Sequence, residues 1–220
     1  MLTPMMSGVT VKPLLTVGDV LPNGYRYEAI PDGISLRKYK GDVEVFVNHE
    51  TSKVPFPFVT AGPTAANGEN DFDNAQVSRL ILDKKTAGVL EGSFLISGDQ
   101  GFQRFCSSYL ATKKEGFKHD ILFTNEEGID YVFRQNASWP PSFGAPAEKQ
   151  IGVVVAVDLK NGQQTPIYGM GRLNHENSLP VPGYKHSVVV LTGDDTFTSG
   201  PLTGVTLPVG VTVPAQSQLY

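Results

Sequence analysis

The sequence predicts an all-β protein. Glycine (23) and proline (16) are plentiful along the whole chain, which favours many short strands joined by tight turns over long helices. Apolar runs are short, and several end at turn-forming residues. The one helix-like pattern, at residues 102–114, is short and weakly periodic. Hydrophobic residues make up 40% of the chain and charged residues 18%, so a packed core is expected.

The expected strands follow one another as short apolar or alternating segments. Residues 77–82 and 89–96 suit a hairpin with a turn at residues 83–86. The clearest hairpin joins residues 152–159 to residues 165–168, because its Asn161-Gly162 turn suits the positive φ angles of a primed turn. The other expected strands are residues 43–47, 121–124 and 187–192, with one or two more at 205–213.

Two long segments, residues 55–74 and 135–149, are rich in proline, glycine, alanine and asparagine and are expected to be loops. No break in composition marks a second domain, so residues 1–220 are expected to form a single domain. Strand pairs at this spacing suit a β-propeller and also a β-sandwich.

Acidic residues beside several expected strands favour the propeller. They occur in four motifs, Asn48-His49-Glu50, Asn125-Glu126-Glu127, Asn174-His175-Glu176 and Asp194-Asp195, with Asp32 as a further candidate. The steps from Glu50 to Glu127 and from Glu127 to Glu176 approximate two blades and one blade of about 40–50 residues. Equivalent strand ends of successive blades converge on the central channel, so these acids would meet there. Taken singly, each motif also suits a solvated turn.

Converging carboxylates repel one another unless a cation is bound, so the pattern predicts a metal site. Oxygen ligands suit Ca²⁺, whereas a set that includes His49 or His175 would also suit Fe, Mn or Zn. A metal cluster can bind phosphate oxygens and activate a bound water, which favours hydrolysis of a phosphoester. The expected metal ligands are Glu50, Glu126, Glu127, Glu176, Asp195 and His49.

Arginine and cysteine offer further candidates. Arg172 is the best candidate for a phosphate contact and, with His175, is assigned to the catalytic residues; Arg104 could also bind phosphate. An arginine in a strand more often makes a structural ion pair. A single cysteine, Cys106, excludes an internal disulfide. It is expected to be a small buried hydrophobic residue, with a role as ligand or nucleophile as the less favoured alternative.

The composition argues against several other classes of protein. A net charge of -4 and a pI near 5.5 provide no basic surface for nucleic acid or an anionic membrane. No stretch approaches the roughly 20 apolar residues that span a bilayer, and no signal peptide is visible. Phosphate-binding loops, dinucleotide fingerprints and the common zinc-protease and serine-hydrolase motifs are not found in the sequence.

Several segments resemble, in the family's own order, the N-terminal half of the PhoX-like alkaline phosphatases, secreted bacterial enzymes with a β-propeller fold. They are LLTVGDVLPNGYRYEAIPDGI, VEVFVNHE, GFQRFCSSYLA, ILFTNEEG, and GRLNHEN followed by VVLTGDD. The resemblance implies a channel that holds calcium and iron, a phosphorylated small-molecule substrate, and a periplasmic or extracellular location. It places Glu126 and Glu127 in the family's Cys-Glu-Glu run, Glu176 in its His-Glu segment, and Asp194-Asp195 in its Gly-Asp-Asp segment.

Two departures from the family pattern shape the prediction. Asn125 stands where the family has a cysteine, so calcium or another hard cation is favoured over iron. The chain is long enough for only about four or five blades, which leaves three alternatives: a fragment, a ring closed by assembly, or an open fold.

We therefore expect an incomplete β-propeller that acts as a metal-dependent phosphomonoesterase. The alternative is a non-catalytic, calcium-stabilised propeller that serves as an interaction module. A phytase or lactonase-like hydrolase on the same architecture is a third reading.

Overall fold

The computed structural model describes residues 5–27, 30–50, 75–128, 131–132, 149–150, 152–184 and 186–195. The expected loops at 55–74 and at nearly all of 135–149, and the expected strands at 205–213, lie outside these residues. The prediction of an all-β protein is confirmed, because the described residues form antiparallel sheets with short 3₁₀ turns and no α-helix. Accordingly, this part of the chain contains no helix long and apolar enough to cross a membrane.

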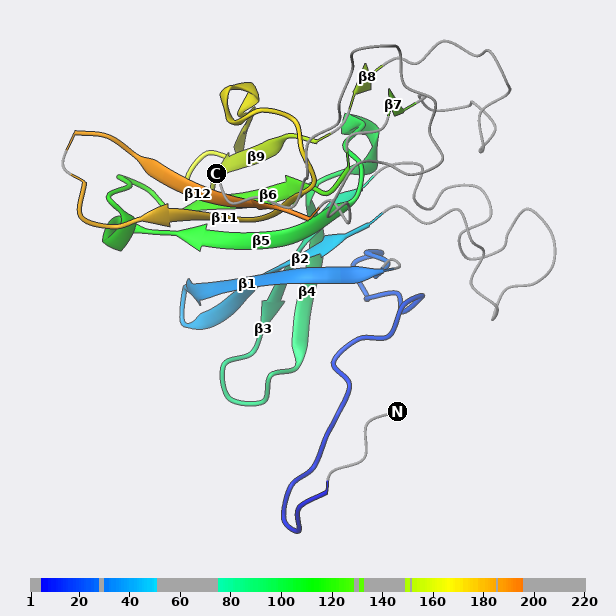
Figure 1. Cartoon of the computed structure of the whole chain (residues 1–220). Helices are drawn as coiled ribbons and strands as arrows, with labels where there is room; N and C mark the ends of the chain where they lie inside the picture. Colours follow the sequence, from blue (N-terminus) through cyan, green and yellow to red (C-terminus); the bar gives the residue numbers. More distant parts are fainter. Residues whose placement is uncertain are drawn as a thin grey trace, which may run out of the picture.

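Two four-stranded sheets each run as a simple meander (Figure 1). The first has the order β1-β2-β3-β4 and the second β5-β6-β9-β10, while β11 pairs with β12 and β7 with β8. We call β1, β5 and β11, the first strands of the two four-stranded sheets and of the β11-β12 sheet, the leading strands. Both β1 and β11 lie alongside β5. The strands are β1 Pro31–Tyr39, β2 Asp42–His49, β3 Gln76–Leu82, β4 Val89–Ile96, β5 Phe105–Ala111, β6 Ile121–Glu126, β7 Tyr131–Val132, β8 Lys149–Gln150, β9 Val154–Asp158, β10 Gln163–Pro166, β11 His175–Val181 and β12 Val189–Asp194.

The main hydrophobic core lies between the first two sheets. Both sheets contribute fully buried aromatic and aliphatic side chains to it: Phe46, Val77 and Ile96 from the first, and Phe105, Leu122, Val155 and Val157 from the second. Burial of apolar area on this scale is the main force that holds the sheets together. The packing also fixes β5 against the first sheet, which matters for the candidate site.

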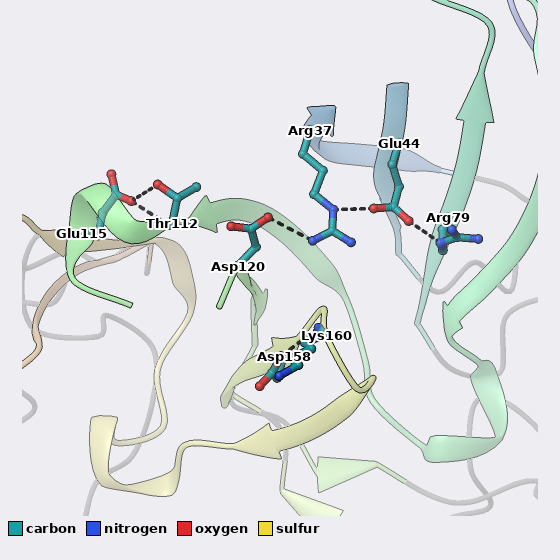
Figure 2. Close-up of polar contacts among 8 residues, drawn as sticks. All are labelled: Arg37, Glu44, Arg79, Thr112, Glu115, Asp120, Asp158 and Lys160. Atoms are coloured by element: carbon teal, nitrogen blue, oxygen red, sulfur yellow. Dashed lines mark hydrogen bonds and ion pairs between the residues drawn. The ribbon is translucent and has the colours of Figure 1, made fainter. Parts of the chain in front are cut away.

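The helix-like stretch expected at residues 102–114 is instead strand β5. Its weak helical periodicity is overridden by antiparallel pairing with β6 and by the burial of Phe105 and Ala111 in two separate clusters. A capping box between Thr112 and Glu115 then forms a single 3₁₀ turn after the strand (Figure 2).

The hairpin expected at residues 152–168 is present as β9 and β10, but its turn differs from the prediction. Asp158 pairs with Gln163, which leaves residues 159–162 in the loop, and of these only Gly162 has a positive φ (74°). The Asp158 carboxylate stabilises the loop by accepting a hydrogen bond from the Lys160 backbone N–H at 2.8 Å (Figure 2). A tight primed turn occurs at Lys40-Gly41 between β1 and β2, where φ is 49° and 98°.

A buried carboxylate joins three strands of the first sheet. Glu44 of β2 is 1% exposed and accepts hydrogen bonds from Arg37 of β1 and Arg79 of β3 (Figure 2). Arg37 also contacts Asp120, directly before β6, at 3.0 Å. This chain of ion pairs therefore connects the first sheet to the second.

Removal of the Glu44 carboxylate should destabilise the fold. We expect Glu44→Ala to lower the free energy of unfolding by about 3 kcal/mol, because two partly buried guanidinium groups lose their partner. Urea denaturation measures the effect. The control is Glu91→Ala: Glu91 is 57% exposed and 3.9 Å from Arg79, so its loss should cost about 0.5 kcal/mol or less. Equal losses in the two variants would contradict this role for Glu44.

Candidate metal centre

Six side chains from three sheets converge where the leading strands begin; we call this group the acidic cluster. The Cys106 thiol and carboxylate oxygens of Asp32 and Glu50 lie within 4.8 Å of one another, and the same limit holds for Cys106, Glu127 and Glu176. Asp195 joins the group through a hydrogen bond to the Glu127 side chain. Each sheet supplies the second residue of its first strand and the residue directly after its second strand: Asp32 with Glu50, Cys106 with Glu127, and Glu176 with Asp195.

A β-bulge at the same place in each sheet accompanies this convergence. In all three sheets the first paired position is followed by a break in register, so that two residues of the leading strand face one residue of its partner. Each bulge begins with the residue that enters the acidic cluster. Gly33 lets the β1 bulge approach β5, since a Cβ at this position would lie 2.4 Å from the Cys106 carbonyl oxygen. The pairs on either side of the breaks are Pro31–His49 and Ile34–Val47, Phe105–Glu126 and Ser108–Thr124, and His175–Asp194 and Ser178–Thr192.

Four members of the acidic cluster, namely Glu50, Cys106, Glu127 and Glu176, have a pKa raised above the ordinary value of their side chain. Burial, followed by the hydrogen bond and the negative charge of Asp32, raises the pKa of Glu50 to about 7. Burial also raises the pKa of Glu127 and of Glu176, with further contributions from the neighbouring carboxylates. Burial and the charges of Glu127, Asp32 and Glu176 raise the pKa of the Cys106 thiol. A bound cation would reverse these shifts, because it stabilises the ionised forms.

Buried asparagine side chains beside the cluster point to a missing partner. Asn48 and Asn125 are fully buried, and the Oδ1 atom of each has no hydrogen-bond partner within the described part of the chain. The Asn48 amide nitrogen donates to the carbonyl oxygens of Cys106 and Ser107, both at 2.9 Å. The Asn125 amide nitrogen donates to Ser107 Oγ at 2.7 Å and to the Glu176 carbonyl oxygen at 3.5 Å. The Oδ1 atoms of Asn48 and Asn125 therefore lie close to the backbone of the acidic cluster, where each could accept a hydrogen bond from water or bind a cation.

The predicted ligands divide into two groups. The structure brings Glu50, Glu127, Glu176 and Asp195 together with Asp32, so these acids meet in space as the sequence predicts. Their role as metal ligands remains a prediction. Glu126, His49, His175 and Arg172 instead have contacts that account for them structurally.

Glu126 belongs to neither ligand group of the acidic cluster, and its carboxylate binds backbone N–H groups. It is fully buried, and its carboxylate accepts hydrogen bonds from Gln103 at 2.9 Å, from Gly152 at 2.9 Å and from Val153 at 3.1 Å. Since neighbouring residues of a strand face opposite sides, Glu126 and Glu127 cannot both enter the cluster. We therefore leave Glu126 out of the proposed metal site.

A structural role for Glu126 has a measurable consequence. We expect Glu126→Gln to lower the free energy of unfolding by about 2–4 kcal/mol, because the new amide group faces backbone donors that lose their acceptor. Calcium affinity of the folded variant should stay within about twofold of the wild type, since the ligand set is intact. Urea denaturation and calorimetric calcium titration measure the two quantities. Unchanged stability together with lost calcium affinity would return Glu126 to the ligands.

Both histidines are fully buried within their sheets. His49 Nε2 lies 2.7 Å from Ser78 Oγ, and its ring packs edge-on against Tyr27 with the centroids 5.1 Å apart. His175 Nδ1 lies 2.9 Å from Thr192 Oγ1, and burial lowers the pKa of His175. These contacts account for both rings structurally. We therefore propose neither histidine as a metal ligand, and we propose no catalytic role for His175.

The two candidate arginines lie in different surroundings. Arg172 is exposed, and its guanidinium lies over the Tyr168 ring, 5.4 Å from the centroid. Arg104 lies beside the acidic cluster, with Nη1 3.3 Å from the Glu127 carbonyl oxygen. The contact set therefore favours Arg104 over the predicted Arg172 as the cation of the site.

Sequence reasoning ranked a ligand role for Cys106 below a buried hydrophobic one, and it took Glu176 for an acid at the end of a strand. Glu50 and Glu127 follow second strands, whereas Glu176 lies at the start of a leading strand, so the true counterpart of Glu50 and Glu127 in the third sheet is Asp195. The step from Glu50 to Glu127 also spans one sheet and not two blades, because residues 51–74 separate β2 from β3 within the first sheet. A usable signal was the acid or thiol after the first residue of each leading strand: Pro31-Asp32, Phe105-Cys106 and His175-Glu176.

The donor set suits a cation centre of mixed character. Carboxylate and amide oxygens are ligands for calcium, whereas the thiol is a ligand that iron or zinc accepts. No family model, curated protein or solved structure matches the chain.

Proposed function

We propose that the protein is a metal-dependent phosphoester hydrolase of the PhoX-like kind, acting on phosphomonoesters. The observation that carries the proposal is the convergence of five carboxylates and one thiol from three sheets. Converging acids of this number are costly without a cation. The Oδ1 atoms of Asn48 and Asn125, which have no hydrogen-bond partner among the residues that the structure describes, also favour a bound ligand. The sequence resemblance supplies the reaction and the periplasmic or extracellular setting.

The sheets β1–β4, β5-β6-β9-β10 and β11-β12 are, in this proposal, successive blades of a β-propeller. Three neighbouring leading strands, meander order within each four-stranded sheet and a bulge at the same place in each sheet support this architecture. The acidic cluster would then lie at one mouth of the central channel.

Two overlapping ligand sets are available for metal ions. Asp32, Glu50 and Cys106 form one, and Cys106, Glu127 and Glu176 form the other. We assign calcium to the oxygen ligands, and the thiol of Cys106 would suit iron despite the asparagine at position 125. Bound metal ions would supply Lewis-acid polarisation of a phosphoryl oxygen. The carboxylates of this chain would hold and orient the ions.

A non-catalytic interaction module stabilised by calcium is the second candidate. Asn125 favours it, because this residue occupies the position of the family cysteine and uses its amide to bind Ser107 and the Glu176 backbone. Such a protein would need the cations for folding but would hydrolyse nothing.

A calcium titration that follows thermal stability and p-nitrophenyl phosphate turnover together separates the two candidates. The phosphatase proposal predicts turnover that rises with metal loading and is lost on chelation. A gain in melting temperature without turnover would favour the interaction module. Turnover that persists in excess chelator would overturn the metal-dependent mechanism itself.

A further inference from the structure

Arg104 is held beside the acidic cluster by contacts on both sides of it. The Glu127 backbone N–H donates to the Arg104 carbonyl oxygen at 2.9 Å, and Arg104 Nη1 donates to the Glu127 carbonyl oxygen at 3.3 Å. The preceding residue, Gln103, donates its backbone N–H to Glu126. The following residue, Phe105, is fully buried in the main core. The position of Arg104 relative to the end of β6 is therefore tightly fixed.

The backbone of Arg104 adopts a conformation that arginine rarely accepts. Its φ is 44°, in the left-handed region, which costs of the order of 1 kcal/mol for a residue with a side chain. Such strain persists only where the surroundings enforce it, and here the flanking contacts of Gln103 and Phe105 do so. In this conformation the guanidinium lies at the end of β6, where its Nη1 atom contacts the Glu127 carbonyl oxygen.

Arg104 places a positive charge beside the acidic cluster. Its side chain contacts the end of the second sheet at the Glu127 carbonyl oxygen. Arg104 is also only partly buried, so a group that enters the cluster from solvent can meet it. The cluster thus combines acids that suit cations with one adjacent cation that suits an anion.

Charge balance explains why an arginine is useful there. With the Cys106 thiol protonated, five ionised carboxylates and two divalent cations would keep one net negative charge, which opposes the approach of a phosphate. One guanidinium cancels that charge and offers paired N–H donors to phosphoryl oxygens.

We propose that Arg104 is the residue that binds the phosphoryl group of a phosphomonoester, or inorganic phosphate, at the metal-loaded acidic cluster. This inference rests on the proposed function for its substrate class, but it concerns anion binding and can be tested without turnover. It also replaces Arg172 as the phosphate contact, since Arg172 lies exposed over Tyr168.

The test measures the affinity of the calcium-loaded full chain for inorganic phosphate by titration calorimetry. Arg104→Gly is the main variant, because glycine adopts a φ of 44° without strain and the variant should stay folded. We expect it to weaken phosphate binding about 10- to 100-fold, the effect of a lost charged hydrogen-bond donor. Arg104→Lys should recover part of the affinity, because it keeps the charge and loses the paired donors. Lys160→Gln, in the exposed turn after β9, is the charge-matched control and should change affinity by less than about twofold.

Calcium affinity provides the second readout. A residue that merely offsets the carboxylate charge would, when removed, leave phosphate affinity intact while calcium binds more tightly. The inference predicts lost phosphate affinity with calcium affinity equal or increased. Phosphate affinity that is unchanged in Arg104→Gly, lost only in Arg172→Gln, or not measurable in the calcium-loaded wild type would overturn it. Phosphate binding that depends on Arg104 without p-nitrophenyl phosphate turnover would support the inference while the phosphatase proposal fails.

Discussion

The double variant Glu127→Gln, Glu176→Gln is expected to bind calcium at least about 100-fold more weakly than the wild type, since two charged ligands are removed. Both residues share one ligand set with Cys106, so no carboxylate of that set remains. Phosphomonoesterase activity should fall with the calcium affinity. Titration calorimetry and p-nitrophenyl phosphate turnover measure the two effects. Full activity in the double variant would contradict the assignment of both residues.

The same variant should have the opposite effect on the metal-free protein. Burial and neighbouring carboxylates raise the pKa of Glu127 and of Glu176, so the ionised forms oppose folding when no cation is present. Glutamine keeps the shape and removes the charge, and we expect the melting temperature in chelator at pH 8 to rise by about 2–4 °C. Glu91→Gln, on an exposed side chain of β4, is the control and should change it little. A lower melting temperature in both chelator and calcium would indicate a purely structural role.

The second large effect is a loss of stability of the metal-free protein as pH rises from about 5 to about 8. Burial first, and then Asp32, raises the pKa of Glu50 from its ordinary 4.5 to about 7 in the folded state. Between these values the folded state holds a proton that the unfolded state has released, so the free energy of unfolding decreases with pH. The stabilisation is complete below pH 4.5 and is lost as pH passes about 7. Because Glu50 is half-exposed and screened by solvent, we expect it to contribute about 2 kcal/mol.

Calcium should change the pH profile. Ionised carboxylates are the ligands, so cation binding releases protons and calcium affinity should rise with pH. Thermal unfolding at pH 5, 6.5 and 8, in chelator and in saturating calcium, measures both behaviours. Glu50→Gln should flatten the metal-free profile between pH 5 and 8, since it removes the carboxyl group whose pKa is raised to about 7. A metal-free wild type that gains stability over this range would contradict the account.

The turn residues and short apolar runs were sufficient to predict an all-β fold and its clearest hairpin. They were not sufficient for β5, because the pairing of Phe105–Ala111 with β6 and the burial of Phe105 outweigh a weak local pattern. The four-residue turn after β9 was also missed, since Asn-Gly suits several turn types and the Asp158 side chain selects this one.

The candidate site was predicted in part, for a physical reason. Acids at strand ends can be recognised in the sequence, and Glu50, Glu127, Glu176 and Asp195 do meet. Adjacent acids such as Glu126 and Glu127 cannot be separated in this way, because a strand sends them to opposite faces and the sequence does not state which face is core. The bulges that begin at Asp32, Cys106 and Glu176 depend on pairing between strands, so the acid or thiol at each position does not by itself predict a bulge.

The central claim is that the acidic cluster binds metal ions. Crystals of the full chain soaked in Mn²⁺, which accepts the same oxygen ligands and scatters anomalously, test it most directly. The account predicts an anomalous peak about 2.0–2.6 Å from carboxylate oxygens of Glu50, Glu127 or Glu176. A map in which the cluster holds no peak while other surface carboxylates do would contradict it.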